Sequence, residues 1–416
     1  MPEPPPERAD VVVVGAGIVG LATARAVQLA RPDAHVVVVD KEHHVGVHQS
    51  GHNSGVVHAG IYYRPRSRKA ELCRSGRAEL LAWCERHGVE VHRGGKVVVA
   101  VEPGELDALA ELERRAEGTG VRVARLSPAQ LAEVEPYAFG LAALHVPETA
   151  VVDFGRVCAV LAEGIVARGG ALALGHAVTA VERRAAEVVV RTPSAEVRTH
   201  RLANCAGLHS DRIAALAGDR TEATIVAFRG EYHQLAPRAR HLVRSLVYPV
   251  PDPRFPFLGV HLTRGLDGSV HAGPNAVLAL SREGYRWRDV RALDVADLAR
   301  HASTWRLAAR YWREGAAEVA RSLSIRRLAR AVQRLVPELD ERDLVAAGSG
   351  VRAQAVGRDG RLLDDFAFAG DERVVHVVNA PSPAATASLA IGRVVASRLL
   401  GTDGGTPQRG IAGVID

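Results

Sequence analysis

A strand, a glycine-rich turn, a helix and a second strand follow one another at the start of the chain. Residues 10–14 (DVVVV) are continuously apolar, as in a parallel strand that is buried on both faces. Three glycines follow in G-x-G-x-x-G spacing, and the next residues predict a helix that ends before Pro32. A second apolar run, 35–39 (HVVVV), leads to Asp40. This order predicts a dinucleotide-binding βαβ unit.

Each glycine of this unit has its own physical task. Gly15 allows the tight turn from strand to helix, Gly17 lets the backbone approach a pyrophosphate, and Gly20 lets the helix pack closely on the strand. The pyrophosphate then sits on free N–H groups at the positive end of the helix. Asp40 is placed to accept hydrogen bonds from an adenosine ribose, and it argues against NADP because a carboxylate repels the extra phosphate. The unit predicts an ADP-containing dinucleotide and leaves NAD and FAD both open.

Size and composition are those of a folded protein with an ordinary surface. The chain has 416 residues, enough for two domains or one large one, with 47% apolar and 24% charged residues. The net charge is +6, but 53 lysines and arginines are interleaved with 47 acidic residues. A solvated surface with local positive wells for an anionic ligand therefore fits better than a nucleic-acid partner.

Features that indicate a cellular compartment are few. The four cysteines form no C-x-x-C pair, which argues against a zinc ribbon or a disulfide framework and fits a reducing compartment. The polar, proline-rich start does not resemble a signal peptide, and no apolar stretch reaches the roughly 18 residues of a membrane span. We expect a cytoplasmic protein, and peripheral contact with the inner face of the cell membrane stays open.

The stretch 48–63 (HQSGHNSGVVHAGIYY) has a composition that no ordinary helix or strand needs. A metal site is one hypothesis, because His44, His48 and His52 are four residues apart. Two glycines interrupt that run, however, and there is no H-E-x-x-H arrangement, so we expect no metal. A serine nucleophile is a second hypothesis, but there is no G-x-S-x-G elbow and the histidines are too close in sequence for a triad.

The third hypothesis is a loop laid against a cofactor. The run 50–55 (SGHNSG) offers backbone N–H groups without large side chains, together with serine and asparagine groups that can bond phosphate and ring heteroatoms. A plain glycine-rich surface loop is the alternative. We interpret the run as a cofactor loop that brings backbone close to a flavin. Its residues are Ser50, Gly51, His52, Asn53, Ser54 and Gly55.

With these residues in view, the chain resembles a known family. The run 48–65 (HQSGHNSGVVHAGIYYRP), followed by RKAELC, is similar to the FAD-dependent L-2-hydroxyglutarate dehydrogenases and oxidases of the D-amino-acid-oxidase-like flavoprotein superfamily. The similarity covers almost the whole chain. Further matching blocks lie at 148–157, 204–214, 228–235, 248–264, 273–280, 350–366 and 379–392.

The resemblance implies an α/β fold of two intertwined domains. A Rossmann-like FAD-binding domain is expected from 1–95, 146–220 and 340–416, and a substrate domain on a mostly antiparallel sheet from 96–145 and 221–339. The stretch from about 288 to 339 is rich in Ala, Leu, Arg and Glu with helical periodicity, which predicts a helical insertion.

The resemblance also implies further cofactor contacts. Ala206 and Gly207 would lie beside FAD, Val178 would hold the adenine end, and Gly350 and Val351 would lie near the flavin. The turn 382–386 precedes the last helix, and the free N–H groups of residues 384–386 would stabilise negative charge on the reduced flavin. The remaining expected contacts are Ile18, Val19, Lys41, Ser382, Pro383, Ala384, Ala385 and Thr386.

Arg352 is our candidate for the substrate carboxylate, because a guanidinium forks onto a carboxylate with two parallel hydrogen bonds. An ordinary surface arginine is the alternative. A second carboxylate needs further donors. The candidates are Tyr62, Tyr63, Arg64, Arg229, Tyr232 and His261.

The resemblance predicts oxidation of the small dicarboxylate L-2-hydroxyglutarate to 2-oxoglutarate, with hydride transfer to flavin N5. We assign His58 as the base, since an imidazole suits that role near neutral pH; a histidine that only binds flavin or substrate is the alternative. A related enzyme acting on another 2-hydroxy acid or an amine, such as a D-amino acid or sarcosine, and a protein that merely holds a dinucleotide both stay open. The electron acceptor is oxygen, a quinone or a carrier protein.

Overall fold

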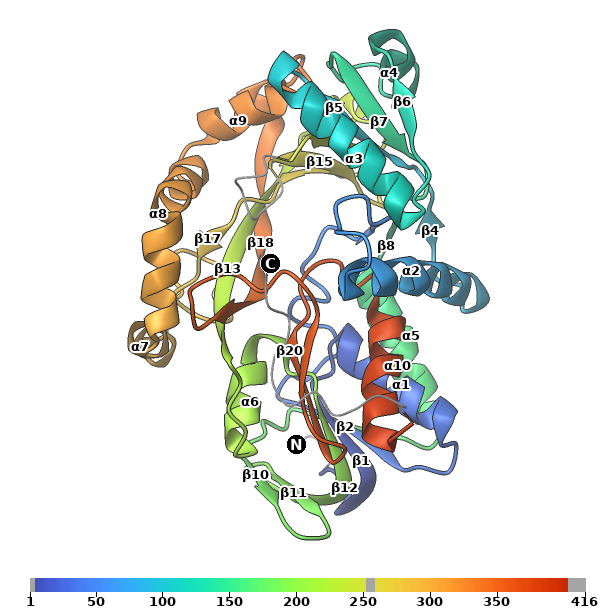
Figure 1. The fold of residues 1–416 in the computed structure, drawn as a ribbon, viewed down its shortest axis with the longest axis vertical. Helices are drawn as coiled ribbons and strands as arrows, with labels where there is room; N and C mark the ends of the chain where they lie inside the picture. The colour runs from blue at the N-terminus through green and yellow to red at the C-terminus, as the bar shows by residue number, and fades with distance from the viewer. Residues whose placement is uncertain (1–3, 252–258, 403–416) are drawn as a thin grey trace.

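A computed structural model describes residues 4–251 and 259–402. Two large sheets, joined by a small one, make up its framework (Figure 1). Residues 252–258 of the sequence block at 248–264 lie outside the described residues.

The first sheet has eight strands, and its centre is parallel. The order β9–β2–β1–β12–β20 runs parallel throughout, and β10, β11 and β19 join antiparallel. The predicted strands at 10–14 and 35–39 are confirmed as β1 and β2, each within two residues. The strand bounds are β1 Arg8–Val14, β2 Val36–Asp40, β9 Ala171–Leu174, β10 Ala180–Arg183, β11 Val188–Arg191, β12 Glu196–Asn204, β19 Ala367–Gly370 and β20 Val374–Asn379.

Both faces of the β1 strand are buried, which explains its uninterrupted run of valines. Val11 and Val13 pack with the helices α1 (Ile18–Ala30), α5 (Phe154–Ala167) and α10 (Ser388–Leu400), which lie together beside the sheet in Figure 1. Val12 and Val14 pack on the opposite side, with the short helix α6 (Ser210–Leu216). Alternate side chains of a strand point to opposite faces, so an all-apolar strand requires cover on both.

The second sheet has nine strands and is mostly antiparallel. Its order is β18–β13, then β16–β15–β14–β5–β7–β6, with β17 also beside β13; only β14 and β5 pair in parallel. The strand bounds are β5 Lys96–Ala100, β6 Ala124–Leu126, β7 Ala142–Val146, β13 Ala223–Leu235, β14 Leu246–Pro249, β15 His261–Arg264, β16 Val270–Gly273, β17 Val277–Leu278 and β18 Leu344–Gly357.

Helices cover both faces of this second sheet. Val98 of β5 packs with α3 (Leu106–Thr119), whereas its neighbour Val97 packs in the core that includes α9 (Ile325–Gln333). The predicted helical stretch before β18 forms α7, α8 and α9, which follow the outer side of β13 and β18 (Figure 1). The other helix bounds are α2 Arg68–Arg86, α4 Pro128–Val134, α7 Ala292–Arg300 and α8 Ala302–Ser322.

The segment between β2 and α2 connects the two large sheets. Its residues pair in a small sheet formed by β3 (Val56–Val57), β8 (Ala150–Val152) and β4 (Val91–His92). Just after β3, Ile61 is buried in the same core as Tyr248 of the second sheet. The first sheet draws its strands from all three parts of the expected FAD domain, and the division into domains stays our proposal.

Among the described residues, no helix is long and apolar enough to cross a membrane.

We predict that Gly20→Ala destabilises the protein. A Cβ at Gly20 would lie 1.9 Å from the carbonyl oxygen of Gly15, so α1 must move away from β1. Overpacking of this kind costs about 1–3 kcal/mol or more, and denaturant titration measures it. Gly315→Ala is the matched control, because a Cβ there meets no atom within 4 Å in an exposed helical turn. It should leave stability unchanged or raise it by up to ~1 kcal/mol. Equal stability of the two variants would contradict the prediction.

Candidate active site

The first turn of α1 is built to receive an anion. Gly15 has a φ of +110°, and a Cβ there would lie 2.5 Å from the carbonyl oxygen of Cys205. Gly17 offers no capping side chain, and the first turn of α1 has no acidic residue. The Ile18 N–H donates to the Ser50 hydroxyl at 2.9 Å, and the Ala16 N–H donates to Asp40 Oδ2 at 2.6 Å. Small residues, helix N–H groups and an acid at the end of β2 together fit a dinucleotide.

Two further segments bring backbone close to this cradle. After β12, Ala206 donates its N–H to the Asn204 side chain at 3.2 Å, and Gly207 has a φ of +52°. A Cβ at Gly350 of β18 would lie 2.3 Å from the carbonyl oxygen of His52. The predicted cofactor loop and β18 therefore touch through their backbones, and any side chain at Gly350 would separate them. Val178 packs against the core on the far side of β1.

The turn before α10 lies against the segment that contains His58. The Thr386 hydroxyl accepts the His58 N–H at 3.0 Å, and the Ser382 hydroxyl lies 3.4 Å from His58 Nε2. The Ala384 N–H donates to the carbonyl of Pro381 at 2.9 Å, so it is not free as the sequence suggested. No acceptor in the described part of the chain receives the N–H groups of Ala385 and Thr386. These two remain available to an anionic edge of a ligand.

His58 is deep in the protein and uncharged. Burial has the largest effect on its imidazole, and it lowers the pKa to about 3 together with repulsion from neighbouring basic groups. The side chain still keeps part of its surface accessible, so a small ligand can reach it. The basic neighbours are Lys96, His261, Lys69 and Arg352.

The sheet side of this site is aromatic and cationic. The rings of Tyr248 and His261, on the neighbouring strands β14 and β15, stack with centroids 4.0 Å apart. Burial lowers the pKa of His261 to about 4 and raises that of Tyr248. Lys96, the first residue of β5, is 1% exposed and has its Nζ 4.4 Å from the ring centre of Tyr62 and 5.0 Å from that of Tyr248. Its charge is held by ring faces and not by a carboxylate.

Arg352 lies on β18 and is half-buried. Within the described ranges it forms no ion pair with an acidic residue, and it influences the pKa of His58, His261 and Tyr248. Lys69 differs, because its Nζ pairs with Asp364 at 3.0 Å. The site thus contains two basic side chains without acidic partners around a neutral histidine.

The structure brings together only part of the expected substrate group. His58, Tyr62, His261 and Arg352 lie around one centre, as described above, and Tyr63 lies beneath Lys69 at 5.3 Å. The other candidates lie elsewhere or have other contacts. Arg64 is exposed, and Arg229 pairs with Glu231 at 3.3 Å and stacks on Trp287. Tyr232 meets His271 edge-on, but in addition to burial it also raises the pKa of Tyr248 and so lies beside the centre. A substrate role for these three stays a prediction.

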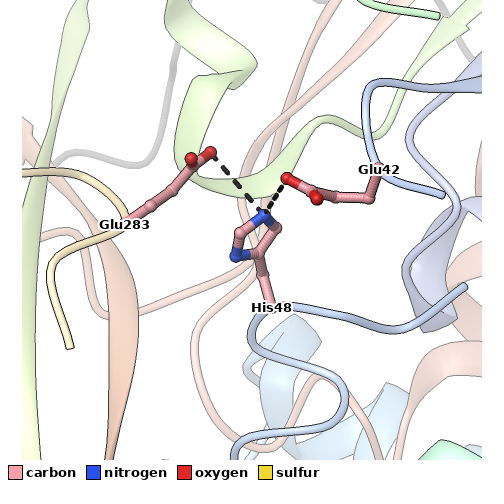
Figure 2. Close-up of side chains that lie close together, drawn as sticks. All are labelled: Glu42, His48 and Glu283. Atoms are coloured by element: carbon pink, nitrogen blue, oxygen red, sulfur yellow. Dashed lines mark hydrogen bonds and ion pairs between the residues drawn. The ribbon is translucent and has the colours of Figure 1, made fainter. Parts of the chain in front are cut away.

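A polar cluster near the cofactor loop was not foreseen. Figure 2 shows His48 between Glu42 and Glu283, with Nε2 at 3.0 Å and 3.6 Å from their carboxylate oxygens. One ligand atom from each residue lies within 4.8 Å of the others, a spacing that suits a metal ion. His44 and His52, which the sequence aligned with His48, do not belong to this cluster.

Lys41 already supplies the positive charge in this cluster. Its ammonium forms an ion pair with Glu42, lies 2.7 Å from Glu283, and is 2.9 Å from His48 Nε2. His209 joins through Glu283 at 2.7 Å. The cluster therefore connects the residues just after β2, His48 before the cofactor loop, the turn after β12 and the loop before α7 as an ion-pair network. It offers no vacant cation position, and Lys41 faces carboxylates.

Two site residues escaped sequence reasoning for the same reason. Lys96 opens the run KVVVA and Glu283 stands in SREGY, where a charged residue normally lies in solvent. A signal was present for Lys96, because the chain has only three lysines among its 53 basic residues. The burial of Lys96 is a property of the strand register, and the partners of Glu283 come from distant segments of the chain; the local sequence contains neither.

The sequence of the chain is similar to those of known FAD-dependent oxidoreductases. The sequence pattern of the family FAD dependent oxidoreductase matches residues 10–398. An L-2-hydroxyglutarate dehydrogenase of Indibacter alkaliphilus is 43% identical over 388 residues, covering 93% of this chain and 97% of the relative. The mitochondrial L-2-hydroxyglutarate dehydrogenase of Homo sapiens is 41% identical over 408 residues, covering 94% and 88%.

Solved structures share the fold. The dithionite-reduced L-alpha-glycerophosphate oxidase of Mycoplasma pneumoniae, with FAD bound, superposes with a TM-score of 0.78 at 22% identity and 95% coverage of both chains. Glycine oxidase of Geobacillus kaustophilus superposes with a TM-score of 0.72 at 19% identity, again with 95% coverage of both. These likenesses show the fold and carry no statement about substrate.

We predict a pH-dependent stability difference between the wild type and Lys96→Met. Burial lowers the folded-state pKa of Lys96 to about 7, whereas unfolded lysine titrates near ~10.4. Between these values the unfolded wild type binds more protons than the folded form, so its free energy of unfolding rises with pH relative to the variant. Below about pH 7 both states are protonated and the difference is constant. Denaturant titrations from about pH 6 to pH 9 measure the difference.

Lys41→Met is the control for this titration. Burial alone would lower the pKa of Lys41, but its bonds to Glu283 and Glu42 raise it above the ordinary value. Its difference from wild type should therefore stay flat over the same pH range. A flat difference for Lys96→Met as well would contradict the prediction.

Proposed function

This chain belongs to the family of FAD-dependent oxidoreductases, and from that premise we propose that it oxidises the secondary alcohol of L-2-hydroxyglutarate to 2-oxoglutarate. The observation that carries the proposal is the site itself: Lys96 and Arg352, both without acidic partners in the described chain, lie around a neutral His58. A buried cation is costly unless an anion joins it. Two such groups in one site suit a substrate with two carboxylates.

FAD is the cofactor of this family, and the cradle residues fit it. Its ADP half would be held by the first turn of α1, the carboxylate of Asp40 and the cofactor loop at Ser50. The flavin would lie near Gly207, Gly350 and the N–H groups before α10. When bound, FAD supplies the acceptor for the hydride that leaves C2 of the substrate.

His58 takes the hydroxyl proton of the substrate in this proposal. Its low pKa in the free site reflects burial and the basic groups around it. A dianionic substrate offsets the charges of Lys96 and Arg352, which raises the pKa of His58 toward the range of an effective base. Substrate binding thus prepares the base. Two contacts hold His58 in place. The Thr386 hydroxyl accepts its backbone N–H at 3.0 Å, and the Ser382 hydroxyl lies 3.4 Å from Nε2 of its imidazole.

Arg352 orients the substrate. Its guanidinium can donate two parallel hydrogen bonds to the two oxygens of one carboxylate, which limits rotation as well as distance. Placing the C2–H bond correctly is worth several kcal/mol of the barrier in general, about 7–11 at most. The carboxylate next to the reacting carbon is the one that needs such control.

Turnover also needs an electron acceptor, and oxygen, a quinone or a carrier protein can take that role. We keep the cytoplasm as the proposed location, with peripheral contact at the inner face of the cell membrane as the arrangement that a membrane quinone would require.

The first test of this function is flavin reduction. Anaerobic addition of L-2-hydroxyglutarate to the FAD-bound protein should bleach the oxidised flavin band within one catalytic cycle. The D enantiomer, D-amino acids and sarcosine are the controls, and we expect them to bleach it at least ~100-fold more slowly, because a hydrogen-bonded site rejects a misplaced polar group strongly. Bleaching by an amine and not by the 2-hydroxy acid would overturn the proposal.

We predict that His58→Ala lowers the rate of flavin reduction by about 10²–10⁴-fold, the usual contribution of a positioned base. FAD content and the unfolding transition should stay near those of wild type. His200→Ala, on the exposed side of β12, is the control and should react at the wild-type rate. Near-normal reduction by His58→Ala would leave the histidine with a binding role only.

A further inference from the structure

The three lysines of this chain are not surface residues in the ordinary sense. The sequence uses arginine for nearly all of its 53 basic positions and keeps lysine at 41, 69 and 96. Lys41 pairs with Glu42 and Glu283, and Lys69 pairs with Asp364. Lys96 is the exception, because its ammonium forms no ion pair or hydrogen bond within the described ranges and lies only against ring faces.

Lys96 is also the most deeply placed of the three. It is 1% exposed, and its ammonium lies against the rings of Tyr62 and Tyr248. Ring faces stabilise a cation by about 2 kcal/mol, less than the several kcal/mol that removal of an ammonium from water costs. The Tyr62 hydroxyl is likewise buried without a hydrogen-bond partner in the described chain. The Lys96 ammonium is a cation without an acidic partner, and the neighbouring Tyr62 side chain carries a hydroxyl donor without an acceptor. Together these two groups form half of an anion-binding site.

The position of Lys96 separates it from Arg352. Lys96 begins β5, and Arg352 lies on β18 at the other end of the strand order β18–β13–β16–β15–β14–β5. Both nevertheless lie close enough to His58 and His261 to lower the pKa of these histidines beyond the effect of burial, and the stacked rings of Tyr248 and His261 link the Lys96 ammonium to the same group of side chains. A ligand with an anionic group at each end can reach both while its middle passes His58.

We propose that Lys96, with the Tyr62 hydroxyl, binds the carboxylate of the substrate that is remote from the reacting carbon, and thereby selects dicarboxylic over monocarboxylic 2-hydroxy acids. This inference rests on the proposed function, in which Arg352 holds the carboxylate beside that carbon.

Among the donors suggested by the sequence, Arg64 is exposed. Arg229 is buried and two of its nitrogens lack a hydrogen-bond partner in the described chain, but its charge is offset by Glu231 at 3.3 Å and by the ring of Trp287. Lys96 is the better candidate because it is buried and unpaired.

The test compares two substrates that differ at one end. L-2-hydroxyglutarate and L-2-hydroxypentanoate share the reacting carbon and its carboxylate, but a methyl group replaces the remote carboxylate in the second. In Lys96→Met we expect the concentration of L-2-hydroxyglutarate that half-saturates anaerobic flavin reduction to rise on the order of 100-fold. Removal of one partner of a buried charge pair has an effect of this size. Half-saturation by L-2-hydroxypentanoate should change less than about threefold, since that ligand has no charge to lose.

Lys69→Met is the matched control, because it removes a lysine near His58 whose charge Asp364 already offsets. Its preference for the dicarboxylate should match that of wild type. If Lys96→Met raised the half-saturating concentrations of both substrates equally, the residue would be structural and the proposal overturned. If wild type were not reduced by L-2-hydroxyglutarate at all, the proposed function would fail before this inference is reached.

A second measurement uses the wild-type holoenzyme and needs no folded variant of Lys96. With lysine labelled at ¹³Cε, only three side-chain signals arise from the sequence, and Lys41→Arg and Lys69→Arg assign two of them. Addition of the product 2-oxoglutarate should shift the third signal, that of Lys96, and leave the other two in place. Shifts of Lys41 or Lys69 with an unmoved Lys96 signal would overturn the proposal.

Discussion

The hydrogen bond from the Ile18 amide to the Ser50 hydroxyl, 2.9 Å long, is the contact on which the site depends. It fastens the segment between β2 and α2 to the nucleotide end of α1. A few residues later the carbonyl of His52 touches β18 at Gly350, where a Cβ would lie 2.3 Å away. The segment is thus held between the two sheets, and these contacts fix the position of His58 within it. Glycine at 350 is required because only a bare backbone permits that approach.

The distribution of charge determines which ligand this arrangement can bind. Away from the site, acidic and basic side chains are interleaved, and even the half-buried network around Lys41 is internally paired. Around His58 the basic groups Lys96 and Arg352 have no such partners among the described residues. Burial keeps His58 neutral, so the centre can accept a proton while its two ends attract anions. The same feature that makes the empty site unfavourable makes a dianionic ligand favourable, because the ligand removes the penalty.

Much of the nucleotide-binding half could be predicted, since its signals are local. The valines of β1, the spacing of the three glycines and Asp40 after β2 all describe a backbone path of about forty residues, and each piece lies where the spacing predicted. The helices before β18 follow equally from their periodicity. Two details were different. Ala384 donates its N–H to the carbonyl of Pro381, and Glu283 joins Lys41 and His48 in a network that no short motif predicts.

The sequence by itself determined the dinucleotide cradle and the segment that carries His58, because both are set by residues close together in the chain. Only the tertiary structure decided which basic residues face that histidine. Lys96, Tyr248, His261 and Arg352 come from β5, β14, β15 and β18, and the register of one curved sheet brings them to a common centre. A lysine before a run of valines looks like any charged strand end. Its burial, and therefore its chemistry, arises from strands that pair more than a hundred residues apart in the chain.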